Sequence, residues 1–70
     1  MAYIVKFKNK FTKNKWTEQL FLFSTKAKAE RNAKQLTKSE KDDKGVEFKT
    51  VAKAVKVDKK KAPYNKMVSV

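Results

Sequence analysis

Apolar residues are densest along residues 16–23, where every residue from position 20 onward is apolar. Successive side chains of a strand point to opposite faces, so a strand built from this run would be buried on both of them. Burial on both faces is typical of the middle of a sheet. The pattern therefore predicts a central strand, with Leu20 and Leu22 on one face and Phe21 and Phe23 on the other.

A helix is expected directly after this strand. Ser24 or Thr25 supplies a hydroxyl that can cap the first amides of a helix. Ala29, Ala33 and Leu36 then follow at helical spacing, which gives a narrow face of mostly small residues. The helix is predicted to run from Thr25 to about residue 41, with this face packed closely on a sheet.

Residues 2–8 alternate in the manner of a half-solvated strand. One face is apolar and the other is mostly basic. The apolar face carries Tyr3, Val5 and Phe7, and the basic face carries Ile4, Lys6 and Lys8. Residues 9–15 are mostly polar, which suits a hairpin loop that leads into the central strand.

The second half of the chain predicts a turn and two further strands. Residues 39–45 have turn chemistry that stops the helix, and the chain's one glycine, Gly45, can take a positive φ there. Residues 46–57 fit either a strand or a helical face; their valine and threonine content favours a strand with a bulge near its middle. Residues 58–65 form a basic turn, and residues 66–70 alternate as a short edge strand.

Together these elements predict one domain over residues 1–70. Its class is α+β: a small antiparallel sheet of about four strands, in the sequence order β-β-α-β-β, with one helix packed on one face. One helix cannot cover both faces of a sheet. The second face, with Leu20 and Leu22, is therefore expected either to curl on itself or to meet a partner, which includes a second copy in a homodimer.

The charge of the chain is strongly unbalanced, with 19 basic and 7 acidic residues and a formal net charge of +12. Self-repulsion at this level destabilises a compact domain unless a polyanion relieves it. Arg31 is the one arginine among the basic residues. Lysine suits phosphates, whereas base reading in the major groove leans on arginine, so little sequence specificity is expected. An AT-rich genome would also favour lysine over arginine.

No catalytic or metal-binding constellation is visible in the sequence. The chain has no cysteine and no histidine, which removes thiolate chemistry, the usual general base and the commonest metal ligand. The close carboxylate pair Asp42 and Asp43 falls in a predicted surface turn that lacks the ligand spacing of a calcium loop. The sequence therefore predicts a protein that is not an enzyme and that uses no metal and no cofactor.

Basic side chains gather on the first hairpin, on one side of the helix and in the turn after residue 57. Lysines neutralise phosphates, and aromatic rings stack on unpaired bases. Phe11 and Trp16 lie among the first group, and each ring is expected either to stack on a base or simply to pack on the hairpin. The predicted nucleic-acid contacts are Lys6, Lys8, Lys10, Lys13, Lys15, Arg31, Lys34, Lys59, Lys60 and Lys61.

The residues FSTKAKAE, where the apolar strand passes into the alanine-lined helix, resemble the corresponding junction of the arm-type, AP2-like DNA-binding domains of tyrosine recombinases. The resemblance covers about a dozen residues. Those domains have three strands before the helix, whereas this sequence predicts two before it and a strand region after it. No residue role is carried over from them.

Two functions are consistent with the sequence. The leading one is a small DNA- or RNA-binding protein that contacts phosphate backbones with little sequence specificity. The alternative is a small protein-interaction module or inhibitor, such as a phage-encoded one, that docks on an acidic protein surface or in a nucleic-acid channel. No apolar run reaches the roughly 20 residues that span a membrane, so a cytoplasmic protein with no membrane partner is expected.

Overall fold

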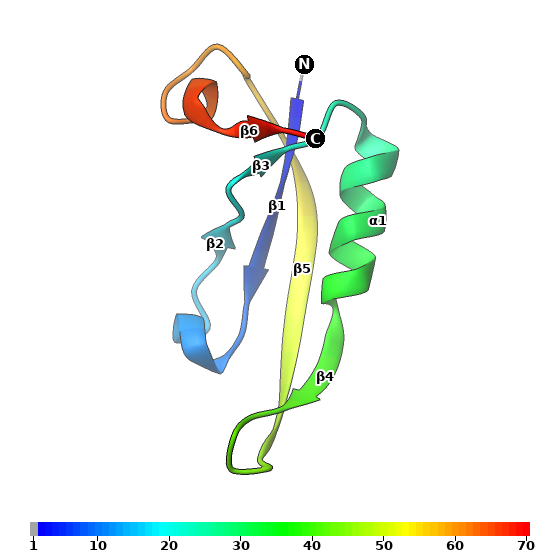
Figure 1. The fold of residues 1–70 in the computed structure, drawn as a ribbon, viewed down its shortest axis with the longest axis vertical. Helices are drawn as coiled ribbons and strands as arrows, with labels where there is room; N and C mark the ends of the chain where they lie inside the picture. The colour runs from blue at the N-terminus through cyan, green and yellow to red at the C-terminus, as the bar shows by residue number, and fades with distance from the viewer. Residues whose placement is uncertain (1) are drawn as a thin grey trace.

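A four-stranded sheet in the order β2-β1-β5-β4 carries one helix, and a two-stranded pair, β3 and β6, lies beside it (Figure 1). This computed structural model describes residues 2–70. All neighbours in the larger sheet are antiparallel, which confirms the predicted α+β class and antiparallel sheet. In chain order the elements are β1 (Ala2–Lys8), the 3-10 helix η1 (Lys10–Thr12), β2 (Thr17–Glu18), β3 (Phe21–Leu22), α1 (Lys26–Leu36), β4 (Lys38–Lys41), β5 (Glu47–Val57), the 3-10 helix η2 (Tyr64–Lys66) and β6 (Val68–Ser69).

The central strands are β1 and β5, and the prediction of a central strand over residues 16–23 is wrong. β1 pairs with β5 along its whole length. Residues 16–23 follow the other edge of β1 as the short strands β2 and β3, and the chain bends near Leu20 between them. The bend leaves Leu20 74% exposed and Phe21 44% exposed. Leu22 and Phe23 are buried in two different apolar clusters, so the predicted burial on both faces holds only at the end of the run.

The helix begins where the sequence predicts. The Thr25 hydroxyl accepts a hydrogen bond from the Lys28 N–H at 3.3 Å, which confirms the cap. Ala29 and Ala33 are buried on the face turned to the sheet, with Leu36 packed beside them. These small side chains let the helix lie close to β1 and β5.

The predicted extension of the helix to residue 41 is wrong, because α1 ends at Leu36 and Lys38–Lys41 forms β4. Thr37, between α1 and β4, ends the helix and starts the pairing with β5. Its hydroxyl donates to the Ala33 carbonyl at 2.9 Å and accepts from the Ala52 N–H of β5 at 3.1 Å. One side chain thus closes the helix and begins the contact with β5 that β4 continues.

β5 is one continuous strand, which confirms the strand over the helix for residues 46–57. Its registers with β1 and β4 contain no inserted residue between Glu47 and Val57, so the predicted bulge is wrong. The strand needs no bulge because both of its sides are used. Ala52 and Ala54 pack on the helix side, and Val55 and Val57 pack on the other.

The turn between β4 and β5 contains the glycine that the sequence marks. Gly45 takes φ 77°, as predicted. Asp42 Oδ1 accepts hydrogen bonds from the N–H groups of Lys44 and Val46, each at 2.9 Å. The turn therefore joins two strands rather than stopping the helix.

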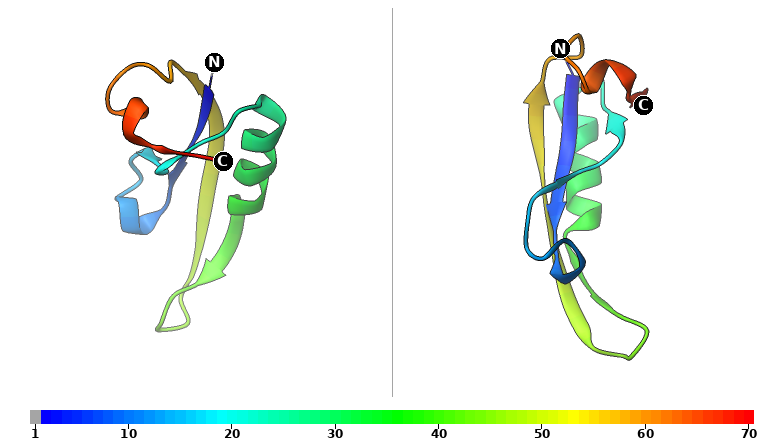
Figure 2. Two further views of the ribbon diagram at one scale, coloured as in Figure 1. Left: turned by 45° about the horizontal axis from the view of Figure 1, so that its top comes forward. Right: turned by 90° about the vertical axis from the view of Figure 1, so that its left-hand side faces the viewer.

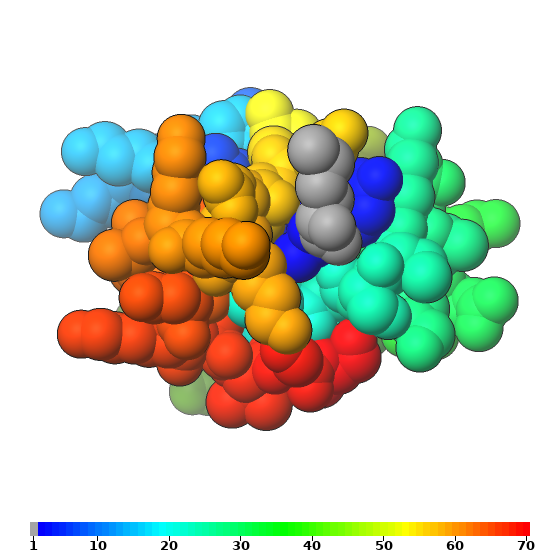
Figure 3. All heavy atoms as spheres, turned by 90° about the horizontal axis from the view of Figure 1, so that it is seen from above, coloured from blue at the N-terminus to red at the C-terminus, as the bar shows by residue number. Residues whose placement is uncertain are grey.

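The second side of β1 is partly covered by the chain's own C-terminal segment. Ile4 and Leu22 form a second apolar cluster, against which Tyr64 and Met67 pack. β6 pairs with β3 in parallel and holds this segment in place. Seen from above, the segment (orange to red) lies beside the N-terminal strand (blue) and the chain that leads into the helix (cyan) (Figure 3). The chain's own C-terminal segment thus fills part of the face that the sequence predicts either to curl on itself or to meet a partner.

Candidate nucleic-acid interface

The side of the sheet turned away from the helix is apolar near the start of β1 and basic near its end. Val5 packs against the helix and Ile4 packs on the opposite side. Because side chains alternate along a strand, Lys6 and Lys8 share the side of Ile4. The register places Lys53 of β5 on the same side, directly opposite Lys6. The helix lies on the far side of the β1–β5 pair from the loop that contains η1 (Figure 2).

Trp16 lies on this basic side, close to two lysines. The register of β1 and β2 pairs Phe7 with Thr17, and extending it by one residue brings Trp16 opposite Lys8. The ammonium nitrogens of Lys8 and Lys53 lie 4.7 and 4.2 Å from the centroid of the indole ring. The residue remains 39% exposed. We call Lys8, Trp16 and Lys53 the Trp16 cluster.

The positive charge of the Trp16 cluster is incompletely balanced by the chain itself. Lys6, next to the cluster, makes an ion pair with Glu18 of β2, with 3.7 Å between Nζ and Oε1. Lys6 also faces Lys53 across the strands, and like charges in such a pair repel. Within residues 2–70, neither Lys8 nor Lys53 makes an ion pair. The side therefore offers free ammonium groups beside a half-open aromatic ring.

Glu18 also anchors the C-terminal segment next to this surface. The Tyr64 hydroxyl donates a hydrogen bond to Glu18 Oε1 at 3.1 Å. This bond to a carboxylate, helped by desolvation, raises the pKa of Tyr64 above its usual value of 10.0. Through this bond the Tyr64 hydroxyl holds η2 against β2.

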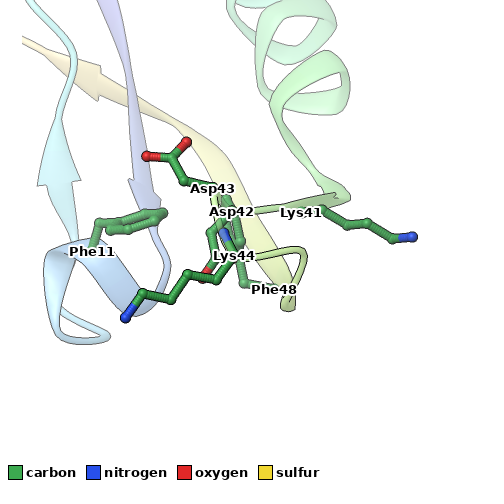
Figure 4. A pocket seen from close by; sticks show the side chains of 6 residues that line it. All are labelled: Phe11, Lys41, Asp42, Asp43, Lys44 and Phe48. Atoms are coloured by element: carbon green, nitrogen blue, oxygen red, sulfur yellow. The ribbon is translucent and has the colours of Figure 1, made fainter.

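The Phe11 ring lies in a separate hollow of about 430 Å³, the Phe11 hollow (Figure 4). Phe11 and Phe48 meet edge to face with their ring centroids 5.0 Å apart, and Phe11 is 67% exposed. The Lys41 side chain extends away from both rings. The hollow is lined by Phe11, Lys41, Asp42, Asp43, Lys44 and Phe48.

The Phe11 hollow is less suited to an anion than the Trp16 cluster. Lys10 lies 5.2 Å from the centroids of both rings, but its ammonium is paired with the Asp42 carboxylate. That pairing, followed by the backbone hydrogen bond from Val46, lowers the pKa of Asp42 below its usual value of 3.8. Asp42 is therefore ionised at neutral pH and, with Asp43 beside it, opposes a phosphate at this place.

The structure separates the predicted contact residues into several groups. Lys6 and Lys8 lie on the basic side of the sheet, and the exposed residues Lys13 and Lys15 lie in the loop before Trp16. The remaining residues are elsewhere. Arg31 and Lys34 are exposed on the helix, and Lys59, Lys60 and Lys61 follow the end of β5 that pairs with the start of β1, away from the loop of Lys10.

The predicted partner face of Leu20 and Leu22 needs a correction. Leu22 is 2% exposed because it is buried against the C-terminal segment, so the folded chain does not present it. Leu20 is exposed and lines an open apolar groove of about 440 Å³ with Met67 and Val68. Val68 is 61% exposed. The apolar surface that remains is thus made by β6 and the bend before β3.

Across residues 2–70, no cluster of three or more carboxylates could hold a metal ion. The helix of this region is neither long enough nor apolar enough to cross a membrane.

Lys53 is the member of the Trp16 cluster that the sequence does not reveal. It looks like one of several evenly spaced lysines on a segment that also fits a helix. Its neighbours become clear only from the pairing of β1 with β5, which sets it opposite Lys6. The alternation of residues 2–8 was the one available signal, since it predicts a basic side for the strand that β5 joins.

Comparison with known proteins adds no relationship: no family model matches the chain, and no curated protein or solved structure matches it.

Proposed function

We propose that the chain is a small nucleic-acid-binding protein that contacts phosphate backbones with the basic side of its sheet. The observation that carries the proposal is the Trp16 cluster, in which Lys8 and Lys53 lie 4.7 and 4.2 Å from a half-exposed indole and have no carboxylate partner within the described chain. The net charge of +12 supports a polyanionic partner.

Binding by lysines follows from the release of counterions. Each phosphate that a lysine neutralises frees condensed cations, so the affinity falls as the salt concentration rises. Lysine contacts phosphates as a point charge and carries no fork for reading a base edge. The proposed protein therefore binds with little sequence specificity, and Lys6, Lys8 and Lys53 are its central contacts.

The test compares two double variants that remove the same charge from opposite sides of the sheet. Lys8→Gln with Lys53→Gln changes the Trp16 cluster, and Lys28→Gln with Lys34→Gln changes the helix. Affinity for single-stranded and duplex oligonucleotides is measured over a range of salt concentrations. On a single strand, each lost phosphate contact makes the negative slope of log affinity against log salt less steep by about 0.7. The cluster variant should therefore reduce the steepness by about 1.4, and the helix variant should leave it nearly unchanged.

The proposal fails if the wild-type chain does not bind either oligonucleotide at low salt, or if its affinity is independent of salt. An equal reduction of the salt dependence in both double variants would also count against the proposal. It would mean that lysines on either side of the sheet contribute equally to binding. Circular dichroism of each variant shows whether the fold is retained.

A second candidate function, docking on an acidic protein, is favoured by the apolar groove. Leu20 and Val68 are 74% and 61% exposed, and the chain as a whole carries a net charge of +12. An acidic protein with an apolar contact would match both features. This function predicts one-to-one binding to a protein that survives nuclease treatment and is lost in Leu20→Asp, with DNA affinity unchanged in that variant.

A further inference from the structure

We propose that the Trp16 cluster takes single-stranded rather than duplex nucleic acid, with a base stacked on the Trp16 ring and neighbouring phosphates held by Lys8 and Lys53. This inference rests on the proposed function and adds to it the substrate class and the role of the ring. It follows from the position of the ring and from the two cations that lie against it.

The ring is part of the open side of the sheet rather than the tip of a projecting ribbon. Trp16 precedes β2 directly, and its ring reaches Lys53 of β5 although β1 lies between those strands. A ring that contacts side chains of two sheet strands does not project as a free wedge between stacked base pairs. Bases inside a duplex show only their edges in the grooves, whereas an unpaired base can bring its whole face to the indole.

In the free protein, the two ammonium groups take the place on the ring that a base would occupy in the complex. Lys8 and Lys53 lie 4.7 and 4.2 Å from the ring centroid, distances at which a cation is attracted by an indole. A base that stacks on the ring displaces at least one of them. Because the ammonium group ends a flexible four-carbon stem, it can then move to a phosphate of the same strand. No covalent bond changes in this exchange.

The other exposed aromatic ring lacks these conditions. Phe11 is more exposed than Trp16, at 67% against 39%. The Phe11 ring already meets Phe48 edge to face. The carboxylates of Asp42 and Asp43 line the same hollow, where they offset the charge of Lys41 and Lys44. The ammonium of Lys10, the cation nearest to both rings, is already paired with Asp42. The base platform is therefore assigned to Trp16.

The test uses three nucleic-acid probes of equal length, which have unpaired bases, no bases or paired bases. They are a thymidine oligonucleotide of about 12 nucleotides, the same backbone with every base removed, and a duplex. Trp16 is the only tryptophan, so its fluorescence reports contact with the ring. The strand with unpaired bases should bind about tenfold or more tightly than the abasic strand and alone should strongly quench the fluorescence.

Trp16→Leu supplies the matched variant, with affinity followed by anisotropy of a labelled strand. It should lower affinity for the thymidine strand to that of the abasic strand and leave abasic binding unchanged. Equal affinity of the wild-type chain for all three probes, with salt dependence kept, would overturn the single-strand inference and leave the proposed function standing. If none of the three probes binds at low salt, both the single-strand inference and the proposed function are wrong. The wild-type comparison decides the matter even if Trp16→Leu does not fold.

Discussion

The ammonium group of Lys53 lies 4.2 Å from the centre of the Trp16 ring, although β1 runs between β5, which carries Lys53, and β2, which follows Trp16. The two side chains therefore meet across the central strand. Lys8, on β1 itself, lies 4.7 Å from the same ring. The Trp16 ring thus contacts ammonium groups from both central strands, β1 and β5.

Replacing Trp16 by leucine should leave the fold intact. The ring is 39% exposed and its two cation contacts are at the surface, where each contributes about 0.5 to 1 kcal/mol. The free energy of unfolding should therefore fall by about 1 to 2 kcal/mol, measured by urea denaturation followed by circular dichroism. A loss as large as that of a buried leucine would show that Trp16 belongs to the core.

Two leucines of similar sequence context should respond very differently to truncation. Leu22→Ala should cost about 2 to 5 kcal/mol, because Leu22 is 2% exposed between Ile4 and the C-terminal segment. Leu20→Ala should change stability by less than about 0.5 kcal/mol, because Leu20 is 74% exposed. Urea midpoints of the two variants provide the comparison. Similar losses in both would place Leu20 in the core as well.

The Thr37 hydroxyl should be needed at the junction of α1 and β4. Thr37→Val removes the acceptor of the Ala52 N–H and the hydroxyl donor to the Ala33 carbonyl. Because Thr37 is exposed, the change should lower the free energy of unfolding by about 0.5 to 1.5 kcal/mol. Thr37→Ser keeps the hydroxyl and should retain most of the stability. Equal stability of the valine variant and the wild type would mean that water replaces the hydroxyl without loss.

The ion pair of Lys10 with Asp42 should make stability depend on acid pH. The pKa of Asp42 is lower in the folded chain than its usual value of 3.8, so the ionised carboxylate stabilises the fold. That stabilisation is complete above the unfolded-state value and is lost as the pH falls through the lowered folded-state value. Asp42→Asn should therefore be less stable than the wild type at neutral pH, with the difference shrinking below pH 3.8.

Asparagine is the suitable replacement because its carbonyl oxygen can still accept from the N–H groups of Lys44 and Val46 in the turn. The change then isolates the charge that faces Lys10. Urea denaturation at several pH values measures the difference. A difference that stays constant between neutral and acid pH would show that the turn geometry, rather than the ionised group, had been altered.

The sequence predicts the fold class because alternation and capping are local. Residues 2–8 alternate and become β1, and the Thr25 cap and the spacing of Ala29 and Ala33 fix the start and the buried face of α1. The end of the helix is not local information. The choice of strand for Lys38–Lys41 depends on Thr37 meeting Ala52 of β5.

The errors over residues 16–23 have a related cause. An apolar run at both parities indicates burial on two faces only if the strand is straight, and the bend near Leu20 breaks that condition. Of the candidate site, the basic side of β1 and the Trp16 ring could be predicted. Lys53 could not, because its approach to Trp16 depends on the pairing of β1 with β5.

The most direct measurement is the mapping of amide chemical shifts in nuclear magnetic resonance spectra as a thymidine oligonucleotide is added to the wild-type chain. The largest changes should fall on the Trp16 indole N–H and on the backbone amides of Lys6, Lys8 and Lys53, with little change along α1. Changes confined to the helix around Arg31 and Lys34, or to the turn at residues 59–61, would contradict binding by the basic side of the sheet.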